Sequence, residues 1–473
     1  MSKFYITTTE PYVNSDPHLG FAMEIVRADV IARFHRLLGD DVVFNTGTDE
    51  HGQKIYQKAL QENKTPQEYC NENAEKYLNL KRVLNLSFTN FIRNTDEKHV
   101  KAAQEFWRRC KKKGDLYKAT YQIKYCVGCE LEKTDSELEN GKCPIHTNLA
   151  LEIYNEENYF FRFSKYQKQL LDLYNKTLDF VVPNFRLEEI KKFVSSGLKD
   201  FSVSRLKEKM PWGVDVPDDP KHVMYVWFDA LINYVSTLGW PDDEKNFRAY
   251  WPVVQLAGKD NLRQQSAMWQ AMLMSAGLPN SKQIYVEGFI TANGQKMSKS
   301  LGNVVDPVKL VNTYGIDPVR YYLLREIPSF DDGDFSERRF LEVYNSDLAN
   351  GIGNLVSRVA KLSESVGLEV ENSKVDFDEE FSKALSEYRF NDAVGFVLKE
   401  TTEADLLLDK TAPWKMIKDG KTEEAKEVLF DLINRVRKIS LMLEPLLPET
   451  SDEINKIFEG PKIKAAIPLF PRI

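Results

Sequence analysis

Short apolar runs alternate with longer amphipathic stretches over the first part of the chain. The runs at 4–9 and 41–44 have the length and the β-branched or aromatic content of buried strands. Elsewhere apolar residues recur every three or four positions, as on one face of a helix, at 19–38, 53–61, 66–84 and 96–112. We therefore predict an α/β fold with a doubly wound parallel sheet, in which residues 1–114 form the first half of a Rossmann-type domain.

The alternation stops near residue 115 and returns near residue 214. Residues 115–213 contain closely spaced cysteines and an aromatic run at 158–161, so we expect an inserted domain there. Residues 214–327 are expected to form the second half of the α/β domain, with strand-like runs at 223–228, 253–257 and 283–286.

The pattern changes again from about residue 328. Strand signals are rare beyond this point, and long amphipathic stretches lie at 336–362, 377–405 and 422–443. Residues 328–473 are therefore expected to form an all-α helical bundle.

Composition narrows the class of protein. Of the 473 residues, 42% are apolar and 29% are charged, which is typical of a globular protein and not of a disordered one. No apolar run reaches membrane-spanning length and no signal peptide is visible at the start, so we expect a cytoplasmic protein without a membrane partner. The net charge of −7 does not indicate a nucleic-acid partner, but the 64 Lys and Arg residues suffice for a local basic track.

Three of the five cysteines cluster with a histidine. Cys126, Cys129, Cys143 and His146 form a CxxC-x13-CxxH pattern, in which each pair can turn two ligands towards one tetrahedral Zn²⁺. Four protein ligands leave no open coordination position, so a zinc ion here would be structural. The alternative is a set of free buried thiols.

Two lysines stand on a short loop flanked by serine and glycine. Lys296 and Lys299, with Ser298 and Ser300, lie in the run KMSKSLGN. Two ammonium groups cannot be desolvated together without dense negative charge beside them, and a polyphosphate supplies that charge. Taken alone, such a pair is more often an ordinary solvated loop.

A strand, a tight turn and a helix are predicted around residues 14–20. Asp16 or Ser15 can cap the helix with Pro17 in its first turn, which leaves backbone N–H groups and the positive end of the helix dipole for a phosphate. His18 could then hydrogen-bond an α-phosphate oxygen, and Gly20 lacks the Cβ that would hold a nucleotide away. The alternative is a histidine that only caps the helix.

These two segments, in this order, resemble the HIGH and KMSKS motifs of class I aminoacyl-tRNA synthetases. Five further segments resemble the methionyl-tRNA synthetase family and occur in the family's order: 12–14, 47–52, 225–230, 258–260 and 303–307. The resemblance implies activation of L-methionine by Mg²⁺-ATP, release of pyrophosphate and transfer of the methionyl group to tRNA(Met). It also implies a monomer, because no dimerisation module follows residue 473.

The resemblance assigns roles residue by residue. His18, Lys296 and Lys299 would be catalytic, and the ATP-binding set would be Pro17, Gly20, Lys296, Ser298, Lys299 and Ser300. Asp49 would hold the α-ammonium of methionine, in a pocket formed with Tyr12, Trp227, Tyr234 and Gln265. In the helical bundle, the readers of the CAU anticodon would be Asn354, Arg358 and Trp414. Without the resemblance, Asp49 could be a helix cap, the aromatic residues simple core, and the Asn/Arg pair part of an ordinary surface.

Four places in the sequence depart from the family pattern. Phe21 replaces the second histidine of HIGH. Glu10 lies where a proline and an aliphatic residue are usual, the segment 263–265 replaces a usual pair of an aromatic residue and a histidine, and Gln270 replaces a proline. An ionised Glu10 would be costly in a methionine pocket unless it were paired, for example with Arg263. Two alternatives therefore stay open: a class I ligase of altered amino-acid specificity, and a catalytically weak tRNA-binding paralogue.

Overall fold

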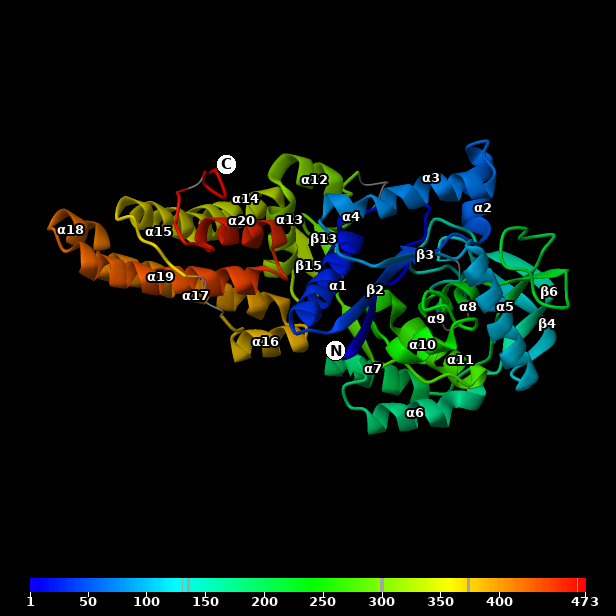
Figure 1. Ribbon diagram of the computed structural model, residues 1–473. Coiled ribbons are helices and arrows are strands. Elements are labelled where there is room, and N and C mark those ends of the chain that lie inside the picture. The colour runs from blue at the N-terminus through cyan, green and yellow to red at the C-terminus, as the bar shows by residue number, and fades with distance from the viewer. Residues whose placement is uncertain (130, 134–136, 298–301, 372–374, 466) are drawn as a thin grey trace. The chain divides into compact units, whose positions relative to one another are not determined.

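The computed structural model describes residues 1–129, 131–133, 137–297, 302–371, 375–465 and 467–473 (Figure 1). The chain forms two compact units, each built from several segments. The first unit comprises Met1–Asp16, Val42–Asn79 and Phe88–Val286, and the second comprises Pro17–Asp41, Leu80–Ser87 and Glu287–Ile473.

A six-stranded sheet is the centre of the first unit. Its strand order is β3-β2-β1-β11-β12-β7, with parallel pairing of β2 with β3, β1 with β11, and β12 with β7. The strands are β1 (Lys3–Thr7), β2 (Asp41–Thr48), β3 (Asn90–Arg93), β7 (Val181–Val182), β11 (Val254–Gly258) and β12 (Gln283–Glu287). Along the chain the sheet grows outwards from β1 to β2 and β3 and from β11 to β12, and β7, which lies within residues 115–213, forms the outer strand beside β12. The predicted doubly wound parallel sheet is therefore confirmed.

The β1/β11 pair is the topological switch point of this sheet. Ile6 lies opposite Val254, and Thr7 lies opposite Gln255. In open α/β sheets, ligands bind beyond the carboxyl ends of the strands at such a point. The residues that follow β1, β2 and β11 are therefore expected to line a ligand site.

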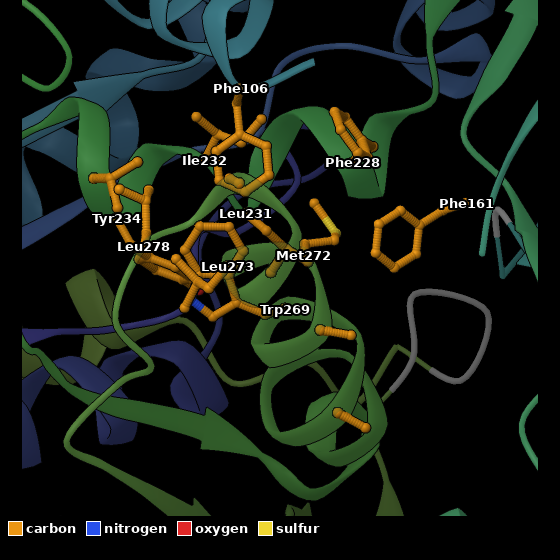
Figure 2. Close-up of a cluster of buried hydrophobic side chains, with 14 of the residues drawn as sticks. Phe106, Phe161, Phe228, Leu231, Ile232, Tyr234, Trp269, Met272, Leu273 and Leu278 are labelled. Atoms are coloured by element: carbon orange, nitrogen blue, oxygen red, sulfur yellow. The ribbon is translucent and has the colours of Figure 1, made fainter. Parts of the chain in front are cut away.

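Helices of the first unit surround an aromatic core. Phe106 of α5 (Glu97–Lys112) stacks on Trp269 of α11 (Trp269–Ala276) at 5.6 Å between ring centroids, and both rings are fully buried. Figure 2 shows this cluster with Phe228, Tyr234 and Met272 around it. The other helices of the unit are α2 (Gln53–Gln61), α3 (Pro66–Leu78), α6 (Gln167–Lys176), α7 (Asn184–Ser195), α8 (Val226–Ala230), α9 (Asn233–Ser236) and α10 (Glu244–Tyr250).

A second sheet of the first unit is antiparallel and lies within the predicted insertion. Its order is β5-β4-β6-β8, and β4 pairs with β6 along ten residue pairs. Its strands are β4 (Leu116–Cys126), β5 (Leu131–Glu132), β6 (Glu152–Phe161) and β8 (Phe201–Ser202). The loss of α/β alternation after residue 115 thus marks a real change of architecture.

The second unit is mostly helical. Arg320 of α13 (Ile316–Arg325) and Asp29 of α1 (Leu19–Leu37) form a buried ion pair at 2.9 Å, which fixes α1 to the unit. A small sheet, β14-β13-β15, combines Gln295–Lys296, Ile290–Ala292 and Gly333–Phe335. The remaining helices are α4 (Leu80–Val83), α12 (Pro307–Tyr314), α14 (Glu337–Val343), the π-helix η6 (Tyr344–Gly353), α15 (Asn354–Ser365), α16 (Glu379–Ser386), α17 (Phe390–Thr411), α18 (Pro413–Lys418), α19 (Thr422–Leu443) and α20 (Pro448–Phe458).

Three expected elements differ in the structure. The run 223–228 is not a strand of the parallel sheet: β10 (His222–Met224) pairs antiparallel with β9 (Ser204–Leu206), and a short helix follows from Val226. The stretch 66–84 is two helices, since α3 ends at Leu78. The stretch 377–405 is also two helices, because Tyr388 adopts a left-handed conformation (φ 58°) between α16 and α17. A short apolar run does not distinguish a buried helix from a strand. A helix can also end and a new one begin without a visible change in the spacing of apolar residues.

No helix in the described part of the chain is long and apolar enough to cross a membrane.

Candidate functional site

Tyr12 and Asp49 are brought together at the carboxyl edge of the parallel sheet. The segment after β1 pairs with the residue after β2: the Asp49 N–H donates to the Pro11 carbonyl at 3.0 Å, and the Val13 N–H donates to the Asp49 carbonyl at 3.1 Å. Asn94 orients the Asp49 carboxylate, since its Nδ2 donates to Oδ1 at 2.8 Å. This carboxylate is half-buried and rigidly placed, as a receptor for a cation requires.

Tyr234 and Gln265 are joined by a hydrogen bond in the first unit. Gln265 Nε2 donates to the Tyr234 hydroxyl at 2.8 Å, and Gln255 Nε2 donates to Gln265 Oε1 at 2.9 Å. Gln265 lies in a π-helical turn, η4 (Gln264–Met268), directly before α11. Such turns are frequent at functional sites. The side chains are buried, so this amide network fixes the Tyr234 ring, which also lies 5.9 Å from Trp269.

Trp227 and Tyr12 pack against one small cluster. Its buried members are Tyr125, Tyr225 and Val226, and the Arg205 guanidinium lies 4.2 Å above the Tyr225 ring. Trp227 itself is only half-buried, so part of its ring is accessible to a ligand. The predicted aromatic residues therefore make two sets of contacts in the first unit: Tyr234 with Gln265 and Trp269, and Tyr12 and Trp227 with the Tyr225 cluster.

A buried carboxylate that sequence reasoning missed holds two histidines. Asp229 of α8 contacts His51 Nδ1 at 2.6 Å and His99 Nε2 at 2.8 Å. These contacts outweigh the desolvation of the buried carboxyl and lower the pKa of Asp229 to about 2. The network connects α8, which carries Trp227, to the segment that follows Asp49. The pairing could not be read from the sequence, because its members are far apart along the chain.

The Glu10 side chain places its carboxyl in a buried position beside this region, and it is not paired with Arg263. Arg263 instead contacts Glu137 at 3.5 Å and lies 4.5 Å from the Phe193 ring. Both Glu10 carboxyl oxygens are buried and have no hydrogen-bond partner among the described residues. Burial and the nearby carboxylates, Asp49 first, hold the pKa of Glu10 well above its ordinary range. The suggested Glu10–Arg263 pair is therefore wrong.

In the second unit, the 17–20 turn lies against the segments that flank the Lys296 loop. The Leu19 N–H donates to the Val305 carbonyl at 3.1 Å. A Cβ placed on Gly20 would come within 3.5 Å of Ile290, the first residue of β13. β13 pairs with β14, which carries Lys296. The two motifs are thus neighbours in space although they are distant in sequence.

The helix cap at this turn differs from the one expected. His18, and not Asp16 or Ser15, is the N-cap of α1, and its Nδ1 accepts from the Gly20 N–H at 3.0 Å. A Cβ on Gly20 would meet the His18 ring at 2.9 Å, so glycine is needed here for the capping imidazole. The His18 side chain is exposed, Pro17 is buried, and Phe21 is buried on α1.

Lys296 lies on an exposed hairpin strand. The turn between β13 and β14 contains Asn293 (φ 52°) and Gly294 (φ 74°), which is the typical sequence of a tight hairpin. The Lys296 ammonium lies 6.0 Å from the Phe289 ring centroid, and the Lys296 carbonyl accepts from Asn303 Nδ2 at 3.1 Å. The other three members of the predicted loop set lie outside the described residues: Ser298, Lys299 and Ser300.

Arg358 and Trp414 come together at one end of the helical bundle. The Arg358 guanidinium lies 5.5 Å from the Trp414 ring, and it pairs with Asp409 at 2.6 Å and Asp405 at 3.3 Å. The Trp414 side chain is 39% exposed, so it is not simple core. Asn354 is exposed one helical turn before Arg358. This arrangement offers a partly exposed indole and hydrogen-bonding groups, as recognition of splayed RNA bases requires.

The Cys/His cluster forms as the spacing predicts. The ligand atoms of Cys126, Cys129, Cys143 and His146 all lie within 4.8 Å of one another. Cys129 Sγ is 3.4 Å from Cys143 Sγ and 3.2 Å from His146 Nδ1, close to the edge length of about 3.8 Å that a tetrahedral Zn–S site gives. A Cβ on Gly128 would meet the His146 ring at 2.5 Å, so the turn of the CxxC pair requires glycine. These four residues could hold one metal ion.

Comparisons with known proteins decide the family. A family model described as tRNA synthetases class I (M) matches residues 4–152 and 128–360. The methionine–tRNA ligases of Nostoc sp. and Thermotoga maritima are each 43% identical to this chain, over 95% and 96% of its length and 89% and 74% of theirs. The chain belongs to the methionyl-tRNA synthetase family.

A solved member of the family has the same fold. The structure of Mycobacterium tuberculosis methionyl-tRNA synthetase in complex with methionyl-adenylate matches with a TM-score of 0.93 and 34% identity, and the match covers 100% of both chains. The resemblance inferred from the motifs is therefore confirmed, together with the α/β fold class. The roles of the individual site residues stay predictions.

Proposed function

We propose that the chain is a methionine–tRNA ligase, which activates methionine with ATP and transfers it to tRNA(Met). The observation that carries the proposal is the proximity of the His18 turn and the Lys296 hairpin within one unit. Adenylate formation needs cationic and N–H donor groups around one triphosphate, and no covalent intermediate on the enzyme. The similarity to methionine–tRNA ligases over nearly the whole chain supports the same activity.

In this function, the second unit binds ATP with Mg²⁺. His18 contacts the α-phosphate, next to Pro17 and Gly20, while Lys296 and Lys299 hold the pyrophosphate as it leaves. Ser298 and Ser300 add hydroxyl donors. Catalysis of this kind depends on positioning and on stabilising the charge that develops, so removal of one cation should lower the rate without abolishing folding.

The first unit supplies the residues that bind the substrate amino acid. The Asp49 carboxylate, held by Asn94, binds the α-ammonium of methionine. Tyr12, Trp227 and Tyr234 give the thioether sulfur–aromatic contacts. Gln265 fixes the Tyr234 hydroxyl, so its contribution to methionine binding includes holding that ring in place.

The remaining parts of the proposal concern tRNA, metal and organisation. Asn354, Arg358 and Trp414 read the anticodon, with a base stacked on the indole. Zn²⁺ is held by Cys126, Cys129, Cys143 and His146, where it stabilises the local fold. We propose the four-part division into residues 1–114, 115–213, 214–327 and 328–473. The cytoplasmic location and the monomeric state stay predictions.

Amino-acid-dependent ATP–pyrophosphate exchange, run over all twenty amino acids, tests the function. Exchange with methionine alone supports the proposal. Exchange with another amino acid would instead identify a ligase of altered specificity. No exchange with any of them would favour a tRNA-binding paralogue and refute the proposed activity.

A further inference from the structure

Glu10 occupies the position in the first unit where a doubly wound sheet binds its ligand. β1 ends at Thr7, so Glu10 follows it at the carboxyl edge, and β1 lies beside β11 at the switch point. The next residue, Pro11, accepts the hydrogen bond from the Asp49 N–H. Glu10 therefore adjoins the segment that carries Asp49, the proposed receptor for the substrate ammonium.

The Glu10 carboxyl is unsatisfied in hydrogen bonding within the described part of the chain. Both of its oxygens are buried, and neither has a hydrogen-bond partner among the described residues. A buried polar group without a partner destabilises the fold and persists in natural proteins mainly where a ligand or water meets it. The location at the switch point and the unpartnered oxygens are independent observations that indicate the same site.

The charged groups that act most strongly on Glu10 are carboxylates from several elements. They are Asp49 after β2, Asp229 on α8, Glu50 beside Asp49, and Asp96 before α5. Glu50 is paired with Arg93, and Asp229 with His51 and His99. The Tyr5 hydroxyl of β1 also interacts electrostatically with Glu10. Burial and these carboxylates raise the pKa of Glu10 well above its ordinary range and so favour the neutral carboxyl.

We infer that Glu10 is a second carboxyl group of the amino-acid site, neutral when the site is empty and ionised when the substrate ammonium binds beside Asp49. The O–H bond of Glu10 breaks, its proton passes to the buffer, and the carboxylate remains paired with the bound cation. This inference rests on the proposed function, because it takes the α-ammonium of methionine as that cation.

The sign of the pH dependence follows from linkage. A cation beside Asp49 lowers the pKa of Glu10, so the complex holds fewer protons than the free protein between the two pKa values. Methionine binding must then tighten as the pH rises, by up to about tenfold per pH unit for one proton. The affinity becomes constant above the pKa that Glu10 has in the free protein.

Isothermal titration calorimetry of the full chain with methionine tests this coupling. Titrations in phosphate and in Tris buffer at equal pH give different binding heats only if protons are exchanged. For the unaltered chain we expect a difference that corresponds to a release of up to one proton, and a dissociation constant that falls as the pH rises. Glu10→Gln and Glu10→Leu should bind methionine with buffer-independent heats and lack this pH dependence. Glu188→Gln on α7, whose native side chain pairs with Lys191, is the matched control and should behave like the unaltered chain.

The results separate this inference from the proposed function. Methionine binding without proton release, or undiminished release in both Glu10 variants, would overturn the inference and leave the ligase assignment intact. No binding of methionine by the unaltered chain at any pH would overturn both. The two variants replace an unpartnered acid with a neutral amide or an aliphatic group. If only one of them folds, that variant alone decides: retained proton release overturns the inference, and lost release supports it.

Discussion

Trp414 provides a prediction that separates anticodon recognition from core packing. The ring is 39% exposed at the start of α18, and its described cationic neighbour is the Arg358 guanidinium at 5.5 Å. Replacement by alanine removes the ring surface on which a base can stack. We expect Trp414→Ala to weaken tRNA charging and to leave pyrophosphate exchange unchanged.

The expected magnitude follows from the two interactions of the ring. The exposed cation–π contact contributes about 0.5–1 kcal/mol, and the part of the ring that is buried adds packing energy, so we expect Trp414→Ala to lose some stability as well. Base stacking on an aromatic side chain contributes about 1–3 kcal/mol, which corresponds to a loss of about 5- to 150-fold in kcat/KM for tRNA. Loss of stability would affect both charging and pyrophosphate exchange, whereas loss of stacking affects charging alone.

Aminoacylation with tRNA(Met) and pyrophosphate exchange without tRNA are the two assays. Trp414→Phe keeps an aromatic face and should retain most of the charging activity. Phe430→Ala, an exposed aromatic position on α19, is the matched control and should alter neither assay. Equal losses of charging and exchange in Trp414→Ala would show that the indole supports the fold and would refute the anticodon role.

Three further predictions concern the nucleotide, the metal and the buried Asp229. Lys299→Ala should raise the activation free energy of pyrophosphate exchange by about 3 kcal/mol and so slow the exchange. Lys309→Ala, at an exposed position of α12, should leave the rate unchanged. An unchanged rate for Lys299→Ala would exclude its role. Elemental analysis should find one zinc per chain, none in Cys143→Ala and one in Cys110→Ala, and a zinc-free native chain would contradict the assignment. Asp229, whose pKa is lowered to about 2, should contribute about 2.5 kcal/mol to the free energy of unfolding at pH 7. This contribution is fully present above about pH 4 and is lost as the pH falls towards 2. The stability difference between the unaltered chain and Asp229→Asn, measured by denaturant unfolding, should therefore shrink over that range, and a constant difference would refute the ionised state of Asp229.

Much of the fold was predictable because its signals are local. The helix at 53–61 is found within its expected bounds, since its apolar residues recur on one face between polar ones. The order of strands in the sheet is a tertiary property, but the alternation of strands and helices leaves few topologies open. The Ser15 or Asp16 cap predicted for α1 was wrong, and the alternative of a capping His18 is the one observed. All three residues are capable of capping, and only the backbone path selects among them.

The site was predictable where spacing along the chain reflects geometry. The four residues of the Cys/His cluster come from two tight turns, so their proximity follows from local structure. The His18 turn and the Lys296 hairpin could be joined only through the family resemblance. The contact of Asp229 with two distant histidines has no sequence signal, because charged residues of this kind are usually solvated.

The central claim is that the chain joins methionine to AMP. Incubation with methionine, Mg²⁺-ATP and pyrophosphatase, without tRNA, followed by mass spectrometry of the extracted small molecules, tests it directly. We predict about one methionyl-adenylate per chain. No adenylate, or an adenylate of a different amino acid taken from an equimolar mixture, would contradict it.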